Sequence, residues 1–148
     1  MIRFNFKHYR KLKSAKKISK MINSEQFLYD SAILNYLKKI DPFVFEELIL
    51  YTFKKRGYKS YRNKRYTGDG GIDGKVKINN QIYLIQAKRY QNYINYQHVV
   101  EFNDLCISQR KEGFFIHTGK TGAVSKTVNS NIQIISGNYL IRFLKYKY

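Results

Sequence analysis

Apolar residues recur with helical spacing early in the chain. From Ser24 to Ile40 they repeat at intervals of three and four, and Ser24 is a suitable N-cap, so we predict a helix over 24–40. Asp41 and Pro42 then predict a second helix start, because an acidic N-cap is followed by proline at the first helical position. This second helix is expected to end near Gly57. Its apolar face consists of Phe45, Leu48, Ile49 and Phe53.

Shorter apolar runs farther along the chain predict strands. Asn79-Asn80 is a tight-turn signal that joins two of these runs into a hairpin. The expected strands cover 58–61, 75–78, 81–88, 114–116 and 132–135, and further helices are expected over 97–111 and 138–144. The order is helix, three strands, helix, two strands, helix, which indicates an α/β domain with a mixed central sheet flanked by helices.

The charge balance indicates a polyanionic partner. The chain has 148 residues, of which 28 are Lys or Arg and 10 are Asp or Glu, so its formal net charge is +18. Nucleic acid or an anionic membrane surface would suit that charge. Phe, Ile, Lys, Asn and Tyr make up roughly half of the chain and have A/T-rich codons, so the lysine excess alone does not identify the partner.

The single cysteine and the hydropathy pattern limit the class of protein. Cys106 excludes an intramolecular disulfide framework and a multi-cysteine zinc site, and it fits a reducing, cytoplasmic compartment. The three histidines are scattered and lack the paired spacing of a zinc site. No apolar run approaches the roughly 18 residues that a membrane-spanning helix needs, so no membrane-spanning segment is expected.

The first 23 residues form a separate basic block. They carry eight positive charges, and no acid occurs before Glu25. A mobile basic arm, a solvated helix face and a phosphate-tracking arm are open interpretations. An organelle transit peptide is disfavoured, since the block has only two arginines and two serines. We therefore divide the chain into a basic, partly helical extension (1–40) and a compact domain (41–148).

Three polar residues in the domain have the pattern of a phosphodiester-hydrolysing site. Asp73 lies in a glycine-rich segment, GDGGIDG (68–74), that precedes a strand of the expected hairpin. Gln86 and Lys88 share one face of the second hairpin strand, because side chains alternate along a strand. A carboxylate, an amide oxygen and an ammonium group beside a glycine-lined bend can hold Mg²⁺ and stabilise charge on a phosphate.

These residues belong to a longer set of motifs that resembles a known family. The motifs are FEEL (45–48), Gly57-Tyr58, GDGGIDG (68–74), YLIQAKRY (83–90) and FIHTG (115–119). In this order and spacing they resemble the Mrr-type restriction endonuclease domain of the PD-(D/E)XK nuclease superfamily. The resemblance covers about residues 41–144 and implies a restriction-endonuclease-like core.

The resemblance also implies roles for individual residues. Asp73 is expected to be the central metal ligand and Lys88 the catalytic lysine, while Gln86 stands where most of the superfamily has Asp or Glu. Because glutamine is neutral and binds Mg²⁺ less strongly than a carboxylate does, Glu46, in the family's helix position, and the backbone carbonyl of Ala87 are expected to assist. The adjacent Glu47 is expected to be a solvated helix acid.

We therefore expect a Mg²⁺-dependent DNA endonuclease, with Mn²⁺ as a substitute ion. These motifs favour DNA as the polyanionic partner, and no membrane partner is expected. The resemblance implies in-line attack of water at phosphorus and a 5′-phosphate product, and a homodimer is expected. Two alternatives remain: a structure-specific nuclease such as a Holliday-junction resolvase, or a non-catalytic DNA-binding module in which Gln86 marks a degenerate site. A ribosome-associated basic protein would not need this set of residues. Candidate phosphate contacts are Lys64, Arg65, Arg89 and Lys120.

Overall fold

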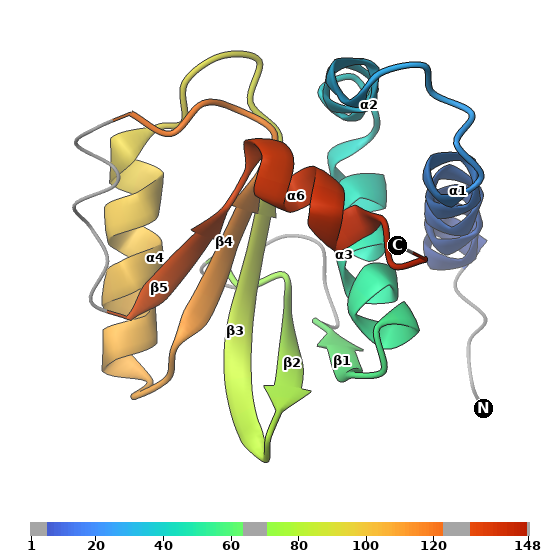
Figure 1. Cartoon of the computed structure of the whole chain (residues 1–148). Helices are drawn as coiled ribbons and strands as arrows, with labels where there is room; N and C mark the ends of the chain where they lie inside the picture. The colour runs from blue at the N-terminus through green and yellow to red at the C-terminus, as the bar shows by residue number, and fades with distance from the viewer. Residues whose placement is uncertain (1–5, 64–70, 123–130, 148) are drawn as a thin grey trace.

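A five-stranded sheet of mixed direction runs through the middle of the molecule (Figure 1). The computed structural model describes residues 6–63, 71–122 and 131–147. The strands, in spatial as well as chain order, are β1 (Lys59–Arg62), β2 (Gly74–Ile78), β3 (Gln81–Lys88), β4 (Gly113–His117) and β5 (Ile132–Ile135). The β1–β2 and β2–β3 pairs are antiparallel, and the β3–β4 and β4–β5 pairs are parallel.

The β2–β3 hairpin sets the register of the sheet. Asn79 and Asn80 form its turn with positive φ values of 50° and 64°, the conformation that a two-residue hairpin turn requires. The turn pairs Ile78 with Gln81 and brings the start of β2 beside Ile85. The hairpin predicted from sequence is thus confirmed, and it places Asp73, just before β2, next to the second half of β3.

Helices cover both faces of the sheet (Figure 1). On one face, α3 (Pro42–Lys55) and α6 (Gly137–Leu144) pack against Ile85 and Ile116. On the other face, α4 (Tyr96–Ser108) packs against Leu84 and Phe115. Neighbouring residues of each strand thus enter different cores, as the pleat requires. The expected α/β fold with a mixed sheet is confirmed.

The start of α3 follows from its capping residues. The Asp41 carboxylate accepts hydrogen bonds from the backbone N–H groups of Phe43 (2.7 Å) and Val44 (3.3 Å), and Pro42 follows as the first helical residue. At the other end, Gly57 adopts φ +94° just beyond the helix. The four apolar residues predicted for the inner face of this helix are all buried.

The helix predicted over 24–40 is wrong in its bounds. A longer helix, α1 (Phe6–Asn23), ends where that helix was expected to begin, and α2 covers only Asp30–Leu37. The hydroxyl and the N–H of Ser24 both donate to the Lys20 carbonyl (2.6 and 2.9 Å), so Ser24 closes α1. Glu25 then turns the chain with φ 55°. The apolar repeat does correspond to a helix, but residues 24–29 and 38–40 lie outside it.

The basic residues 6–23 form a packed helix and not an extended arm. Ala15, Ile18 and Ile22 of α1 are buried in the same core as α3, while Lys13, Lys16, Lys17 and Lys20 are exposed to solvent. The Asn23 amide donates to the Leu144 carbonyl (3.0 Å) and accepts from the Lys147 N–H (3.3 Å). Among the helices that the structure describes, none is long and apolar enough to cross a membrane.

Candidate active site

Asp73 lies at the point where β2 begins. Its N–H donates to the Ile85 carbonyl (2.8 Å), and its carbonyl accepts from the Asn63 N–H (3.2 Å), so its backbone still belongs to the sheet. Its carboxylate accepts a hydrogen bond from the Ala87 N–H at 2.7 Å. The side chain is therefore held against the edge of β3, between the two layers of helices.

Glu46 reaches the same point from α3 and shares a side-chain hydrogen bond with Asp73. Burial, together with the Asp73 charge and that hydrogen bond, raises the pKa of Glu46 to about 9. Burial also raises the pKa of Asp73 to about 6, although the Ala87 N–H, Glu46 and the charge of Lys88 all act to lower it. At neutral pH the pair thus holds about one proton, with Glu46 donating to the Asp73 carboxylate.

Gln86, which directly precedes Ala87 on β3, provides a buried oxygen atom. The residue is 6 % exposed, and its amide oxygen Oε1 has no hydrogen-bond partner among the described residues. Its amide nitrogen lies against Gly71, where an added Cβ would approach Nε2 to 2.7 Å. A buried acceptor without a donor is costly unless something else binds it. A hard cation such as Mg²⁺ is a suitable partner, because it prefers oxygen ligands.

The residues present fit a sparse magnesium site. Within the described ranges, no three His, Cys, Asp or Glu side chains are grouped so as to hold a metal ion. Two carboxylates, the Gln86 amide oxygen and a main-chain carbonyl are instead the available donors. Mg²⁺ usually binds to one or two protein carboxylates and keeps several waters, so this set is sufficient.

Lys88 brings positive charge to the pair. Its charge lowers the pKa of Asp73 and, together with burial as the larger cause, lowers the pKa of His98 at the start of α4. His98 Nδ1 in turn lies 2.6 Å from the hydroxyl of Tyr90. Lys88 thus lies close enough to both Asp73 and His98 for its charge to act on them. No motif or spacing marked His98, because its position depends on how α4 packs.

His117, the last residue of β4, is paired in register with Lys88 of β3. Its Nδ1 accepts from the Gly119 N–H (3.0 Å), so the ring proton sits on Nε2, 2.9 Å from the Thr121 hydroxyl. Burial lowers the pKa of His117 to about 4 and keeps the ring neutral. We therefore regard His117 as a structural residue.

The comparison with known proteins agrees with this geometry. Residues 37–144 match the family of Mrr catalytic domains, which is described as a restriction endonuclease family. The chain belongs to this family. The match runs from the last residue of α2 to the end of α6, so this Mrr-type domain contains Glu46, Asp73, Gln86 and Lys88, and α1 lies outside it.

A curated relative of this Mrr-type domain is the type IV methyl-directed restriction enzyme EcoKMrr of Escherichia coli strain K12. It is 27 % identical over 123 residues, which cover 76 % of this chain and 40 % of the relative. The chain thus spans about two fifths of the length of the curated relative that it matches.

Glu47 of the Mrr-type domain is not the solvated acid expected from its sequence. It is 3 % exposed, and its carboxylate lies 3.1 Å from His8 Nδ1 and 3.5 Å from Arg62 Nε. Glu47 therefore connects α1, α3 and β1. The sequence offered no signal for this role, because His8 comes from a helix that the resemblance did not cover.

The predicted phosphate contacts of the Mrr-type domain lie in different settings. Arg89 donates to the Lys38 carbonyl (2.9 Å) and so fastens the end of α2 to the end of β3. The Lys120 ammonium lies 6.0 Å from the centre of the Tyr93 ring. Lys64 and Arg65 fall outside the described residues. Contacts of these four residues with DNA stay predictions.

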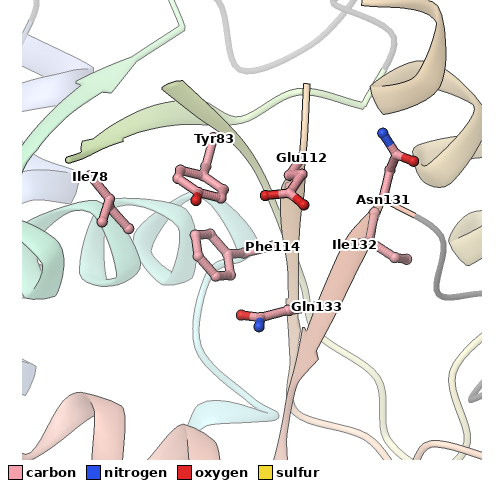
Figure 2. A pocket seen from close by; sticks show the side chains of 8 residues that line it. Ile78, Tyr83, Glu112, Phe114, Asn131, Ile132 and Gln133 are labelled. Carbon is pink, nitrogen blue, oxygen red and sulfur yellow. The ribbon is translucent and has the colours of Figure 1, made fainter. Parts of the chain in front are cut away.

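A separate cavity of about 420 Å³ lies at the opposite end of the strands (Figure 2). Tyr83 and Phe114 stack there with ring centres 5.2 Å apart, next to Glu112 and Gln133. Tyr83 is five residues from Lys88 along β3, or about 16 Å. This cavity is therefore not part of the candidate active site.

Proposed function

We propose that this Mrr-type chain is a Mg²⁺-dependent endonuclease that hydrolyses phosphodiester bonds in DNA. The observation that carries the proposal is the buried amide oxygen of Gln86, which has no hydrogen-bond partner among the described residues. Gln86 directly precedes Ala87, whose N–H holds the Asp73 carboxylate of the hydrogen-bonded Glu46–Asp73 pair. Asp73, Glu46, Gln86 and the Ala87 carbonyl would hold the ion. Mg²⁺ would acidify water and neutralise negative charge on the phosphate, and Mn²⁺ is the expected substitute.

The chain's own residues supply the other parts of the mechanism. The Asp73 carboxylate accepts hydrogen bonds from the Ala87 N–H and from the Glu46 side chain, and these two contacts fix its orientation. The Glu46–Asp73 pair gives up its shared proton when a cation binds. The Lys88 ammonium, already close enough to affect Asp73, stabilises the charge that develops on phosphorus and orients the attacking water.

We propose DNA as the substrate class, and two kinds of DNA are candidates. EcoKMrr is described as methyl-directed, but this chain covers 40 % of its length. Methylated duplex is therefore one candidate substrate, and a four-way junction is another, since a strongly basic chain suits recognition of the DNA backbone and its shape. A homodimer, checked by light scattering, would place one site on each strand of a duplex.

The test compares three DNA substrates, with Mg²⁺, with Mn²⁺ and with EDTA. Purified protein is incubated with plain duplex, methylated duplex and four-way-junction DNA, and products are resolved on denaturing gels. Asp73→Ala and Lys88→Ala are expected to abolish cleavage. Asp104→Ala and Lys77→Ala, which change exposed residues of the same types outside the site, are matched controls and should cut normally.

The outcomes separate the candidate functions. Cleavage that persists in both site variants would contradict the assignment of Asp73 and Lys88. Tight binding without cleavage under every condition would favour a DNA-binding module with a degenerate site. Cleavage confined to junctions, or to methylated duplex, would choose between the two enzymatic alternatives.

A further inference from the structure

A basic groove lies between α1, the last turns of α3 and the C-terminal residues. It has a volume of about 700 Å³, and none of its described lining residues is acidic. Its positive charges come from Lys13, Lys16, Lys17, Lys20, Lys55 and Lys147. Six like charges around one hollow repel one another, so they favour an anionic occupant that neutralises them.

Two tyrosines hold the walls of this groove in place. The ammonium groups of Lys16 and Lys55 lie 5.8 and 5.7 Å from the centre of the Tyr51 ring, within the range of cation–π attraction. Lys55 also lies 5.9 Å from the Tyr146 ring, whose hydroxyl is 3.3 Å from the Ser19 hydroxyl. The aromatic rings thus keep lysine side chains at the groove, which reduces the entropy lost on binding.

The groove is distinct from the candidate active site. Glu46 lies in the first half of α3 and Lys55 is its last residue, so they are about 14 Å apart along the helix axis. Apart from Tyr51 and Lys55, the lining residues lie outside the part of the chain that matches the restriction endonuclease family. Most of the groove is therefore built from residues outside the matched domain.

We propose that this groove binds the phosphate backbone of duplex DNA outside the bond that is cut. Lys13, Lys17 and Lys20 are spaced by four and three residues, so they lie on one face of α1 and span about 10 Å. Phosphates of one DNA strand advance by about 3.4 Å per nucleotide along the duplex axis, so this face covers about three nucleotide steps of the backbone. The proposal rests on DNA being the substrate, but not on cleavage.

The shape of the groove favours DNA over an anionic membrane surface. The lysines surround a hollow, and the phosphate backbone of a duplex is a ridge that enters a hollow. The aromatic rings that line it are engaged by lysines, so they do not supply the exposed apolar anchor that interfacial membrane binding uses.

The test measures DNA binding without divalent ions. Wild-type protein is compared with the double variant Lys17→Gln/Lys20→Gln by fluorescence anisotropy on a labelled duplex, from about 0.05 to 0.2 M KCl. The matched control is Lys59→Gln/Lys77→Gln, which removes two exposed lysines paired across β1 and β2. Thermal unfolding verifies that both variants fold. The same proteins are also tested for sedimentation with vesicles of equal parts phosphatidylcholine and phosphatidylserine.

The groove variant is expected to bind DNA about tenfold more weakly at about 0.2 M salt, with a salt dependence less steep by about 2 in log–log slope. The control should bind like wild type. Equal losses in groove variant and control, or no loss in either, would overturn the proposal. So would a loss of vesicle binding with DNA binding unchanged, which would assign the groove to a membrane surface.

Cleavage of the same duplex with Mg²⁺ separates this proposal from the proposed function. If wild-type protein never cuts but the groove variant loses DNA affinity, the nuclease proposal fails and the groove proposal stands. If wild-type protein cuts and the groove variant binds like the control, the groove proposal alone fails.

Discussion

Gly71 lies so close to Gln86 that a Cβ atom added to it would approach the Gln86 amide nitrogen to 2.7 Å. Gly71 also has φ +91°, which other residues rarely adopt. We expect Gly71→Ala to displace the Gln86 side chain and to lower kcat/KM for DNA cleavage at least about tenfold.

Gly57→Ala is the matched control for this change. Gly57 has a similar φ of +94°, but nothing lies within 4 Å of an added Cβ. Both variants should lose about 1 kcal/mol of stability from backbone strain, whereas only Gly71→Ala should lose activity. Equal activities in the two variants would show that the packing of Gly71 on Gln86 does not matter for cleavage.

Replacing Gln86 with methionine should separate stability from function. The amide oxygen of Gln86 has no hydrogen-bond partner among the described residues, so its loss should change the free energy of unfolding by less than about 1 kcal/mol. Cleavage should fall at least about tenfold because a proposed metal ligand is lost. Urea unfolding and cleavage rates measure the two effects, with Gln81→Met, at the exposed start of β3, as control. Undiminished cleavage would exclude Gln86 as a ligand.

Binding of Mg²⁺ should release about one proton at neutral pH. The pKa of Glu46 is raised to about 9 and that of Asp73 to about 6, so the metal-free pair holds a proton that a cation displaces. Affinity should therefore rise as the pH is raised from about 6 towards 9. Calorimetry in two buffers of different ionisation enthalpy measures the released proton.

Glu46→Gln tests the source of that proton. The variant should bind Mg²⁺ more weakly and release less than half a proton, because the group with the raised pKa is gone. Glu101→Gln, an exposed change on α4, should behave like wild type. A binding heat independent of the buffer in the wild-type protein would contradict the shared proton.

The stability of the fold should decrease as the pH falls from about 6.5 to about 4 through the titration of His117. Its pKa is lowered from 6.5 to about 4 in the folded state, so the unfolded chain binds more protons in this window. The stability that neutral His117 contributes is fully present above about pH 6.5. Its complete loss at low pH lowers the free energy of unfolding by about 3 kcal/mol. The His117→Asn variant retains an acceptor for the Gly119 N–H. It should lack this pH-dependent contribution to stability, because asparagine does not titrate.

Urea unfolding of both proteins at several pH values measures this effect. The difference between wild type and His117→Asn isolates His117 from Asp73, whose raised pKa acts in the opposite direction in the same window. A difference that does not change between pH 7 and pH 4.5 would show that His117 does not titrate as its burial requires.

Most of the fold follows from local signals. Asp41-Pro42 and Asn79-Asn80 each specify a backbone conformation within a few residues, and the structure has the predicted helix start and hairpin there. The N-terminal region was harder to predict because Ser24 suits either end of a helix. Ser24 ends a helix here because Ile18 and Ile22, in the helix before it, are buried against α3. This is a tertiary effect.

The candidate site was predictable where residues share one motif or hairpin. Strand alternation placed Gln86 and Lys88 together, and hairpin pairing placed Asp73 beside them. The burial of Glu47 by His8 and Arg62, and the position of His98 near Lys88, arise from helix packing between segments far apart in sequence. Periodicity carries no information about such contacts.

The contacts of Asn23 affect the order in which the chain folds during synthesis. Asn23 is buried, and its amide is completed by backbone groups of residues 144 and 147. Because synthesis proceeds at about 5–20 residues per second, residue 23 waits many seconds before these partners leave the ribosome. During that time the end of α1 lacks its final contacts, so a stalled or shortened translation product would present an unfinished N-terminal helix to chaperones and proteases.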